Sequence, residues 1–275
     1  MAPLSAKSSE ALARLREYQP PTPSIYNSLP LTRRAAVLIL LFADRRGDLR
    51  VVLTLRSAFL RTFAGQVALP GGRADYLEES PFETARREAY EEIGLPLDHQ
   101  GTLPSTFTVE HICELPCSLA KTVVAVRPCV AFLRDNTPKQ NADVEDTLIP
   151  RLQKDEVESL FTVLLERFLS KTYPLKLPGS DAVEEREWNS GKWLTSYQKP
   201  WRMQEFMAPV WEKTTLREYR VWGMTAKIML DVTRIAYGRN PEFEFNEEIG
   251  DEELIRYLHS EGQMREKQRK PVSTI

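Results

Sequence analysis

Apolar positions along the chain fall into short blocks whose spacing predicts an α/β fold. Residues 34–43 are almost all apolar, which is typical of a strand buried on both faces. The turn-forming residues 44–48 separate this block from a second one at 49–55, and such a pair predicts a β-hairpin. Residues 106–133 predict two or more further strands. The spacing of apolar side chains over residues 224–237 predicts an amphipathic helix.

Both ends of the chain differ in composition from the middle. Residues 8–18 predict a short charged helix, which a proline-rich linker follows. Residues 246–259 predict a C-terminal helix, and the polar stretch 264–275 is typical of a disordered tail. We therefore divide the chain into an N-terminal helix and linker, a central domain, and a partly disordered C-terminal extension, at residues 1–30, 31–240 and 241–275.

Local signals mark both ends of a helix between residues 80 and 94. Ser80 is suited to the N-cap and Pro81 to the first helical position, and Glu83 completes a capping box three residues after the cap. Gly94 is typical of a C-terminal stop. These signals predict the helical register, and therefore which side chains share a face.

Three glutamates project together from this helix. Glu88, Glu91 and Glu92 are three and four positions apart, so they are neighbours on one helical face. Clustered carboxylates repel one another unless a cation lies among them, and hard oxygen ligands suit Mg²⁺ or Mn²⁺. A solvated acidic helix face is the alternative, but it does not explain the glycine-rich turn Leu69-Pro-Gly-Gly72 upstream. The pattern predicts a divalent-metal site, and such metals commonly act on phosphates.

The turn and the helix together resemble the Nudix box, G-x5-E-x7-R-E-U-x-E-E-x-G-U, where U is a bulky apolar residue. This box is the signature of hydrolases that cleave a nucleoside diphosphate linked to another group. The chain departs from it in two places: Ala89 is small, and one extra residue lies between Glu78 and Arg87. Because of the extra residue, both Glu78 and Glu79 are candidates for the first glutamate position. The remaining matches are Gly72, Arg87, Glu88, Glu91, Glu92, Gly94 and Leu95.

The resemblance implies an α/β fold, a Nudix α/β/α sandwich with a mixed β-sheet, here with N- and C-terminal helical extensions. It also implies that the three helix glutamates hold Mg²⁺ or Mn²⁺, with the carbonyl of Gly72 as a further ligand. Arg87 is expected to pair with Glu78 or Glu91 and to orient the glutamates. Glu88 is the first candidate for the general base. Glu156, from a later loop, is the second, although it also fits a solvated turn residue.

The segment before the box resembles the second signature of the coenzyme A diphosphatase branch of this superfamily, L-T-x-R-[SA]-x3-R-x3-G-x3-F-P-G-G. Members of that branch also tend to carry the extra residue in the box. The resemblance implies hydrolysis of coenzyme A or its derivatives to 3′,5′-ADP and a 4′-phosphopantetheine fragment. Only Leu69 departs from the signature, where it replaces phenylalanine. The matching residues are Leu53-Thr-Leu-Arg56-Ser57, Arg61, Gly65 and Pro70-Gly-Gly72.

Several residues of this signature are candidates for substrate binding. A guanidinium can bind two phosphate oxygens, so Arg56 and Arg61 are expected to meet the substrate phosphates. The alternative for each arginine is an ion pair with an acidic residue across the loop. Gly65, Gln66 and Gly71 are expected to let the main chain approach the ligand closely.

Composition and charge exclude several classes of protein. The net charge of −2 and the lack of a basic stripe argue against non-specific nucleic-acid binding. No apolar run approaches the ~20 residues of a membrane span. The three cysteines suggest reduced thiols inside a cell, and their spacing with His111 is not one of the usual zinc patterns. The resemblance suggests a peroxisomal location, with the cytoplasm as the alternative because the C-terminus is not the usual peroxisomal address.

Other functions remain open at this stage. The expected partner is a small-molecule substrate, and a homodimer is an oligomeric state that the sequence allows. Hydrolysis of oxidised nucleotides such as 8-oxo-dGTP would use the same metal ligands. RNA decapping fits the near-neutral charge less well, and a non-catalytic Nudix scaffold would not need the intact glutamates.

Overall fold

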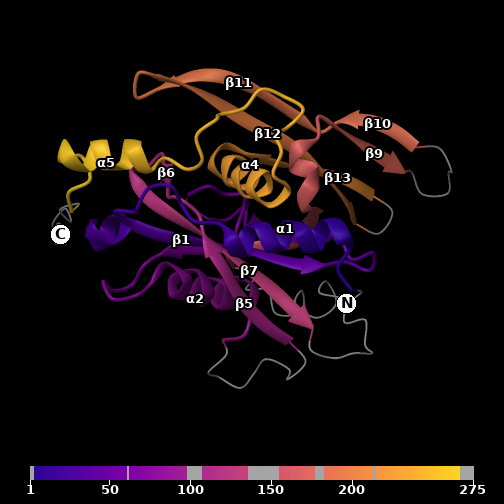
Figure 1. Ribbon diagram of the computed structural model, residues 1–275, viewed down its shortest axis with the longest axis horizontal. Helices are drawn as coiled ribbons and strands as arrows, with labels where there is room; N and C mark the ends of the chain where they lie inside the picture. The colour runs from indigo at the N-terminus through magenta and orange to yellow at the C-terminus, as the bar shows by residue number, and fades with distance from the viewer. Residues whose placement is uncertain are drawn as a thin grey trace.

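The computed structural model describes residues 3–60, 62–97, 107–135, 155–176, 183–212 and 215–266. Within these ranges eight strands form one sheet, with helix α2 on one face and helices α1 and α4 on the other (Figure 1). The strands of this sheet are β1 (Arg34–Ala43), β2 (Leu49–Arg56), β3 (Val67–Ala68), β4 (Gly71–Arg73), β5 (Phe107–Glu114), β6 (Ser118–Ala120), β7 (Val124–Asp135) and β8 (Val157–Leu164). The helices are α1 (Ala6–Glu17), α2 (Pro81–Ile93), α4 (Gly223–Tyr237) and α5 (Glu252–Ser260), with short 3-10 turns η1 (Tyr26–Ser28), η2 (Leu31–Arg33) and η5 (Leu165–Leu169).

The sheet is mixed, which confirms the predicted α/β sandwich. Its order is β3-β2-β1-β7-β5, while β4 pairs with β1, β6 with β7, and β8 with β2. Strand β1 runs parallel to β7 and antiparallel to β2 and β4. Helix α2 covers one face of β1, and helices α1 and α4 cover the other. This cover on both faces explains the continuous apolar sequence of β1.

The two faces of β1 belong to different parts of the core. Leu38 and Leu40 pack on the side of α2, where Ala85 and Ala89 contribute small side chains. Ile39 and Leu41 pack on the opposite side, with the buried leucines of α1 and the apolar face of α4. The alanines let α2 lie close to the sheet, and this places the polar face of α2 beside the edge formed by β4.

A three-stranded sheet covers the outer side of α4, with a separate two-stranded sheet beside it (Figure 1). The long β12–β13 hairpin was not predicted from the sequence. Pro209 in β12 is one reason, since proline is unusual inside a strand. Strand β11 pairs with β12 only as far as Phe206, so at Pro209 β12 is bonded to β13 alone. The strands of this layer are β9 (Thr172–Lys176), β10 (Val183–Glu187), β11 (Asn189–Ser196), β12 (Lys199–Glu212) and β13 (Thr215–Trp222).

The terminal segments pack on the central domain. Helices α1 and α5 overlap the stretches predicted to be helical, although α1 begins two residues earlier than expected and α5 begins six residues later and ends one residue later. Met264, which we expected to begin a disordered tail, is fully buried because it packs with Ile255 and Leu258 of α5. Residues 267–275 of the predicted tail lie outside the described residues.

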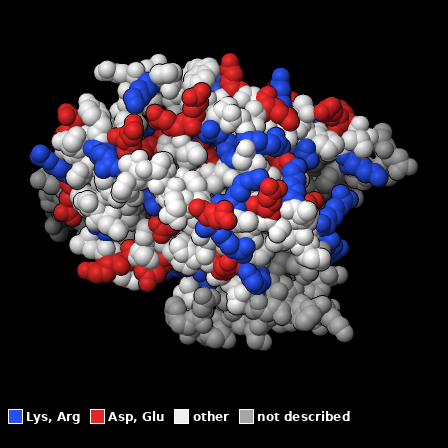
Figure 2. Space-filling model, viewed as in Figure 1, with Lys and Arg blue, Asp and Glu red and all other residues white. Residues whose placement is uncertain are grey.

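The distribution of surface charge and the length of the helices indicate which partners the protein can bind. On the face drawn in Figure 2, acidic side chains lie among the basic ones instead of leaving a continuous basic stripe. Among the described residues, no helix is long and apolar enough to cross a membrane.

The three cysteines are free thiols, with Cys117 and Cys129 buried. Burial raises the pKa of the Cys117 thiol to about 12, so this sulfur stays protonated at neutral pH.

Candidate active site

Helix α2 presents the three predicted glutamates beside strand β4, and local hydrogen bonds set its register. The hydroxyl of Ser80 accepts from the amide of Glu83, and the Glu83 carboxylate accepts from the amide of Ser80. Gly94 ends the helix in the left-handed conformation, with φ 66°. The three glutamates differ in exposure: Glu91 faces solvent, Glu88 is partly buried and Glu92 is buried.

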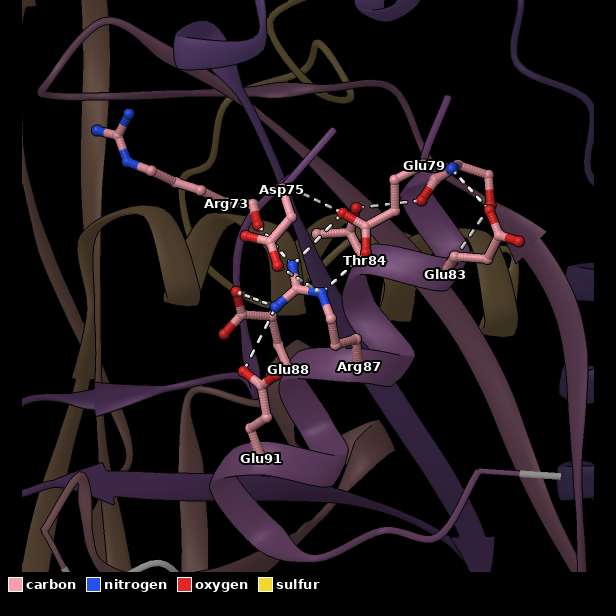
Figure 3. A network of polar contacts seen from close by, with 9 residues as sticks. Arg73, Asp75, Glu79, Glu83, Thr84, Arg87, Glu88 and Glu91 are labelled. Atoms are coloured by element: carbon pink, nitrogen blue, oxygen red, sulfur yellow. Dashed lines mark hydrogen bonds and ion pairs between the residues drawn. The ribbon is translucent and has the colours of Figure 1, made fainter. Parts of the chain in front are cut away.

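An ion pair between Arg87 and Glu79 lies at the centre of the site (Figure 3). Arg87 Nε donates to Glu79 Oε1 at 2.8 Å, and the amide of Asp75 donates to Glu79 Oε2 at 2.9 Å. Burial alone would raise the pKa of Glu79, but these hydrogen bonds outweigh it and hold the pKa below its usual value. Glu79 therefore remains charged and fixes the guanidinium, whereas Glu78 is exposed.

The arrangement decides between the two glutamates that the sequence left open. Glu79, and not Glu78, takes the position that pairs with Arg87. Seven residues separate Glu79 from Arg87, as in the Nudix pattern, so counting back from the arginine would have identified it. The extra residue therefore lies between Gly72 and Glu79, in the loop before α2.

Arg87 also connects Glu79 to the helix face that carries Glu88 and Glu91, which the sequence predicts to bind metal (Figure 3). Its Nη1 lies 3.2 Å from Glu88 Oε1 and 3.4 Å from Glu91 Oε2, and Nη2 donates to the carbonyl of Arg73 at 2.8 Å. The predicted pairing with Glu91 is thus present, and Glu88 is an additional partner. Asp75, which the sequence analysis did not single out, lies 3.4 Å from Arg87 Nε. Together these carboxylates raise the pKa of the guanidinium, with the Glu79 hydrogen bond as the main cause.

Two glycines of β4 allow the glutamates to approach the main chain. A Cβ atom at Gly72 would overlap the carboxylate of Glu88, and one at Gly71 would overlap the main chain of β1. The amide of Gly71 donates to Glu92 Oε2 at 3.1 Å. A side chain at either glycine would therefore displace the neighbouring carboxylate or strand.

Glu92 has an electrostatic environment unlike that of its neighbours. Burial raises its pKa to about 7, and the charges of Glu88 and Glu156 act in the same direction. The Gly71 amide and Arg56, whose Nη1 lies 3.6 Å from Glu92 Oε1, lower it only partly. A buried carboxylate whose negative charge is only partly offset by such contacts is stabilised when a cation binds beside it.

The residues present fit a divalent cation chemically. Within the described part of the chain, no three Asp, Glu, His or Cys side chains are arranged to hold a metal ion as they stand. Arg87 Nη1 lies between Glu88 and Glu91, at distances longer than the 2.8 Å bond to Glu79. These weaker contacts can be exchanged for metal–oxygen bonds without loss of the Glu79 pair. Carboxylates beside the Gly72 main chain are a hard-oxygen set that suits Mg²⁺ or Mn²⁺.

The predicted substrate-binding residues lie beside this carboxylate group, with one exception. Arg56 ends β2, and its buried Nε has no hydrogen-bond partner among the described residues. The Arg56 amide donates to the carbonyl of Gln66 at 3.0 Å, and the amide of Gly65 donates to the Arg56 carbonyl at 3.1 Å. Gly65 has φ 66°, which favours glycine, and has open space around it. Arg61 lies outside the described residues.

Glu156, the second candidate for the base, lies on the same side of the sheet. Its carbonyl accepts from the amide of Ser57 at 2.9 Å, immediately after Arg56. Its side chain is exposed, and its charge contributes to the raised pKa of Glu92. By contrast, burial raises the pKa of Glu88 despite the opposing effect of Arg87. Both glutamates are thus placed near the metal-binding face, and Glu88 is the more enclosed.

Comparison with known proteins gives consistent results. The family model described as NUDIX domain matches residues 32–188. The chain is 34% identical over 274 residues to peroxisomal coenzyme A diphosphatase 1 of Saccharomyces cerevisiae, covering 88% of this chain and 80% of that protein. It is 36% identical to Nudix hydrolase 15, mitochondrial, of Arabidopsis thaliana, covering 77% of this chain and 61% of that protein.

Solved structures show a partial likeness. The Caenorhabditis elegans Ap4A hydrolase binary complex is 19% identical and has a TM-score of 0.33, covering 48% of this chain and 80% of that chain. The Nudix domain of Shewanella oneidensis NrtR with ADP ribose is also 19% identical and has a TM-score of 0.31, covering 48% and 72%. The family match and the sequence relatives carry the assignment: the chain belongs to the Nudix hydrolase family.

Proposed function

We propose that this Nudix hydrolase cleaves the diphosphate bond of coenzyme A or its derivatives, releasing 3′,5′-ADP and a 4′-phosphopantetheine fragment. The observation that carries the proposal is the position of Arg56. This arginine belongs to the signature that resembles the coenzyme A branch, its Nη1 lies 3.6 Å from Glu92 Oε1, and its Nε has no partner in the part of the chain that the structure describes. The name of the yeast relative, which the chain matches over most of its length, points to the same substrate class.

The proposed mechanism assigns each group of residues a distinct role. Glu88, Glu91, Glu92 and the carbonyl of Gly72 would hold Mg²⁺ or Mn²⁺, which neutralises diphosphate oxygens and lowers the pKa of water. Arg56 would bind a phosphate oxygen through its guanidinium, whose Nε has no hydrogen-bond partner within the described ranges. Arg87 holds the glutamate face in register through Glu79 and does not itself contact the substrate.

Glu88 is the first candidate for the general base. It takes a proton from the attacking water as the new P–O bond forms and the bridging P–O bond breaks, so that each product keeps one phosphoryl group of the diphosphate, and 3′,5′-ADP also retains the 3′-phosphate. Glu156 is the alternative base, because its exposed side chain can approach the substrate from the turn before β8.

The location of the enzyme is proposed from the relatives. The name of the yeast relative contains a peroxisomal location, and that of the Arabidopsis relative a mitochondrial one. We favour the peroxisome, with the cytoplasm as the alternative. Fluorescence microscopy of the tagged full-length chain beside a peroxisomal marker tests this choice, and a diffuse signal contradicts it.

A substrate panel tests the activity. Purified protein is assayed with Mg²⁺ and with Mn²⁺ against coenzyme A, an acyl-coenzyme A, 8-oxo-dGTP and capped RNA, with the products identified by mass spectrometry. We expect 3′,5′-ADP from the first two substrates. Efficient hydrolysis of 8-oxo-dGTP with no product from coenzyme A would contradict the substrate proposal while leaving the family intact. Glu92→Gln serves as the control for contaminating hydrolases.

A further inference from the structure

Two consecutive arginines at the start of β1 are both buried. Arg33 is 8% exposed and Arg34 is 5% exposed, and each guanidinium donates to three main-chain carbonyls. A buried charge is tolerated only where such hydrogen bonds replace water. The two side chains bond to different parts of the molecule, so their contacts indicate what each one holds in place.

Arg34 joins the N-terminal segment to the loop that precedes α2. Its Nε donates to the carbonyl of Leu29 at 2.8 Å and its Nη2 to that of Asn27 at 2.7 Å. Its Nη1 donates to the carbonyl of Leu77 at 2.9 Å, and its own carbonyl accepts from the amide of Ala74 at 3.2 Å. Arg34 therefore holds the loop at both ends, through its main chain and its side chain.

The loop held by Arg34 carries the residues that fix Arg87. Tyr76 and Leu77 are 52% and 55% exposed, so their side chains contribute little packing. The main-chain hydrogen bonds consequently set the path of the loop. Two residues after Leu77 the loop reaches Glu79, whose amide donates to the carbonyl of Tyr76 at 3.3 Å. Glu79 then holds Arg87, which contacts Glu88.

We propose that Arg34 is a positioning residue of the metal site. The N-terminal segment at residues 27–29 anchors its guanidinium, and Arg34 in turn sets the position of Glu79 and hence the arrangement of Glu88 and Glu91. This inference rests on the proposed metal-binding role of the helix glutamates. The metal site would then depend on residues 27–29, which precede the sheet and contain none of the proposed metal ligands.

Arg33 provides a matched control within the same chain. Its Nε donates to the carbonyl of Arg265 at 2.9 Å, Nη1 to that of Val123 at 2.9 Å, and Nη2 to that of Gln263 at 3.3 Å. It thus holds the C-terminal extension, away from the Glu79 loop. Replacing either arginine removes the same chemistry from a similarly buried position, but only Arg34 is joined to the glutamates.

The test compares Arg34→Lys with Arg33→Lys in the full-length chain. Mn²⁺ affinity is measured by electron paramagnetic resonance of the free ion, and kcat and KM are measured on coenzyme A. For Arg34→Lys we expect roughly tenfold weaker Mn²⁺ binding and a similar fall in kcat with little change in KM, the scale for residues that support metal ligands. Arg33→Lys should lower the melting temperature comparably and leave Mn²⁺ affinity and kcat near wild type. Unchanged Mn²⁺ affinity in folded Arg34→Lys, or an equal loss in Arg33→Lys, overturns the inference.

Two further variants apply if Arg34→Lys does not fold. Leu77→Gly frees the loop main chain, whereas Leu77→Ala removes the same exposed side chain without that freedom. Weaker Mn²⁺ binding by the glycine variant supports the inference, and equal affinities overturn it. The Mn²⁺ measurement does not depend on the substrate. If the wild-type protein binds Mn²⁺ but ignores coenzyme A, only the proposed substrate fails, and kcat is then measured on the diphosphate that the panel identifies.

Discussion

Arg87 and Glu79 form a bidentate ion pair although they stand eight positions apart in the chain. The Nε–Oε1 distance is 2.8 Å and the Nη2–Oε2 distance is 3.4 Å. Glu79 lies in the loop before α2, and Arg87 lies in the helix, between that loop and the glutamates proposed to bind metal. The pair therefore transmits the position of the loop to Glu88 and Glu91, which Arg87 also contacts.

Replacing Glu79 should impair catalysis, and replacing its neighbour should not. Glu79→Gln removes the charge that holds a partly exposed guanidinium, an interaction worth about 1.5–3 kcal/mol, so we expect kcat to fall about ten- to a hundredfold. Glu78→Gln alters an exposed side chain and should leave kcat within about twofold of wild type. Steady-state kinetics on both variants distinguish the two positions. Equal effects would show that the ion pair has no part in turnover.

Removing a single metal ligand should abolish most of the activity without unfolding the protein. We expect Glu92→Gln and Glu91→Gln to lower kcat by roughly two orders of magnitude or more, because an amide binds Mg²⁺ less well than a carboxylate. Circular dichroism checks that the variants remain folded. A folded Glu92→Gln protein with wild-type kcat would rule out its assignment as a ligand.

The two candidate bases make different predictions for the pH–rate profile. A general base must be deprotonated, so activity falls as pH drops below its pKa, and loss of the base removes this acidic limb. We expect Glu88→Gln to lose at least as much activity as Glu156→Gln and to lose the limb, because Glu88 is the more enclosed. If Glu156→Gln is more impaired and lacks the limb, the order of the candidates is reversed.

Glu92 should make the stability of the metal-free protein dependent on pH. Its folded-state pKa is raised to about 7, so its contribution to stability is present below the unfolded pKa and is lost as pH rises through about 7. The expected loss in the free energy of unfolding between pH 5 and pH 8 is at most about 3 kcal/mol. Urea denaturation in the presence of a chelator measures it.

The Glu92 effect has two internal checks. Glu92→Gln cannot titrate at this position, so its stability should change less with pH than that of wild type. Mn²⁺ should restore stability at pH 8, because it binds the deprotonated carboxylate. Glu91→Gln is the control, since Glu91 is exposed. Identical pH dependence in wild type and Glu92→Gln would mean that another group is responsible.

Arg56 should act mainly on substrate binding. Arg56→Ala removes a charge-assisted contact worth about 1.5–3 kcal/mol, so we expect KM to rise about ten- to a hundredfold and kcat to change less. Arg50→Ala is a control on the same strand, where Arg50 donates to Thr162. Dephospho-coenzyme A, which lacks the 3′-phosphate, shows whether Arg56 contacts that group. A variant whose KM matches wild type for both substrates would exclude Arg56 from the binding site. For Arg61, which lies outside the described residues, binding of a substrate phosphate stays a prediction.

Much of the catalytic helix and the centre of the sheet could be predicted because their signals are local. The capping box and Gly94 act within one turn of α2, so they determine its ends and the common face of Glu88, Glu91 and Glu92. The apolar run of β1 likewise required cover on both faces, which the structure provides. Such features depend on neighbours in the sequence and not on how distant segments meet.

Tertiary structure alone decided the remaining relationships. Counting back from Arg87 identifies Glu79 in the pattern, but the contact itself depends on the path of the loop, where the carbonyl of Leu77 accepts from Arg34. Arg56 meets Glu92 only because β2, β4 and α2 pack together. The β12–β13 hairpin and buried Met264 depend in the same way on the surfaces that they cover. The free energy of these contacts comes from burial and hydrogen bonding between segments far apart in the chain, so no local pattern encodes them.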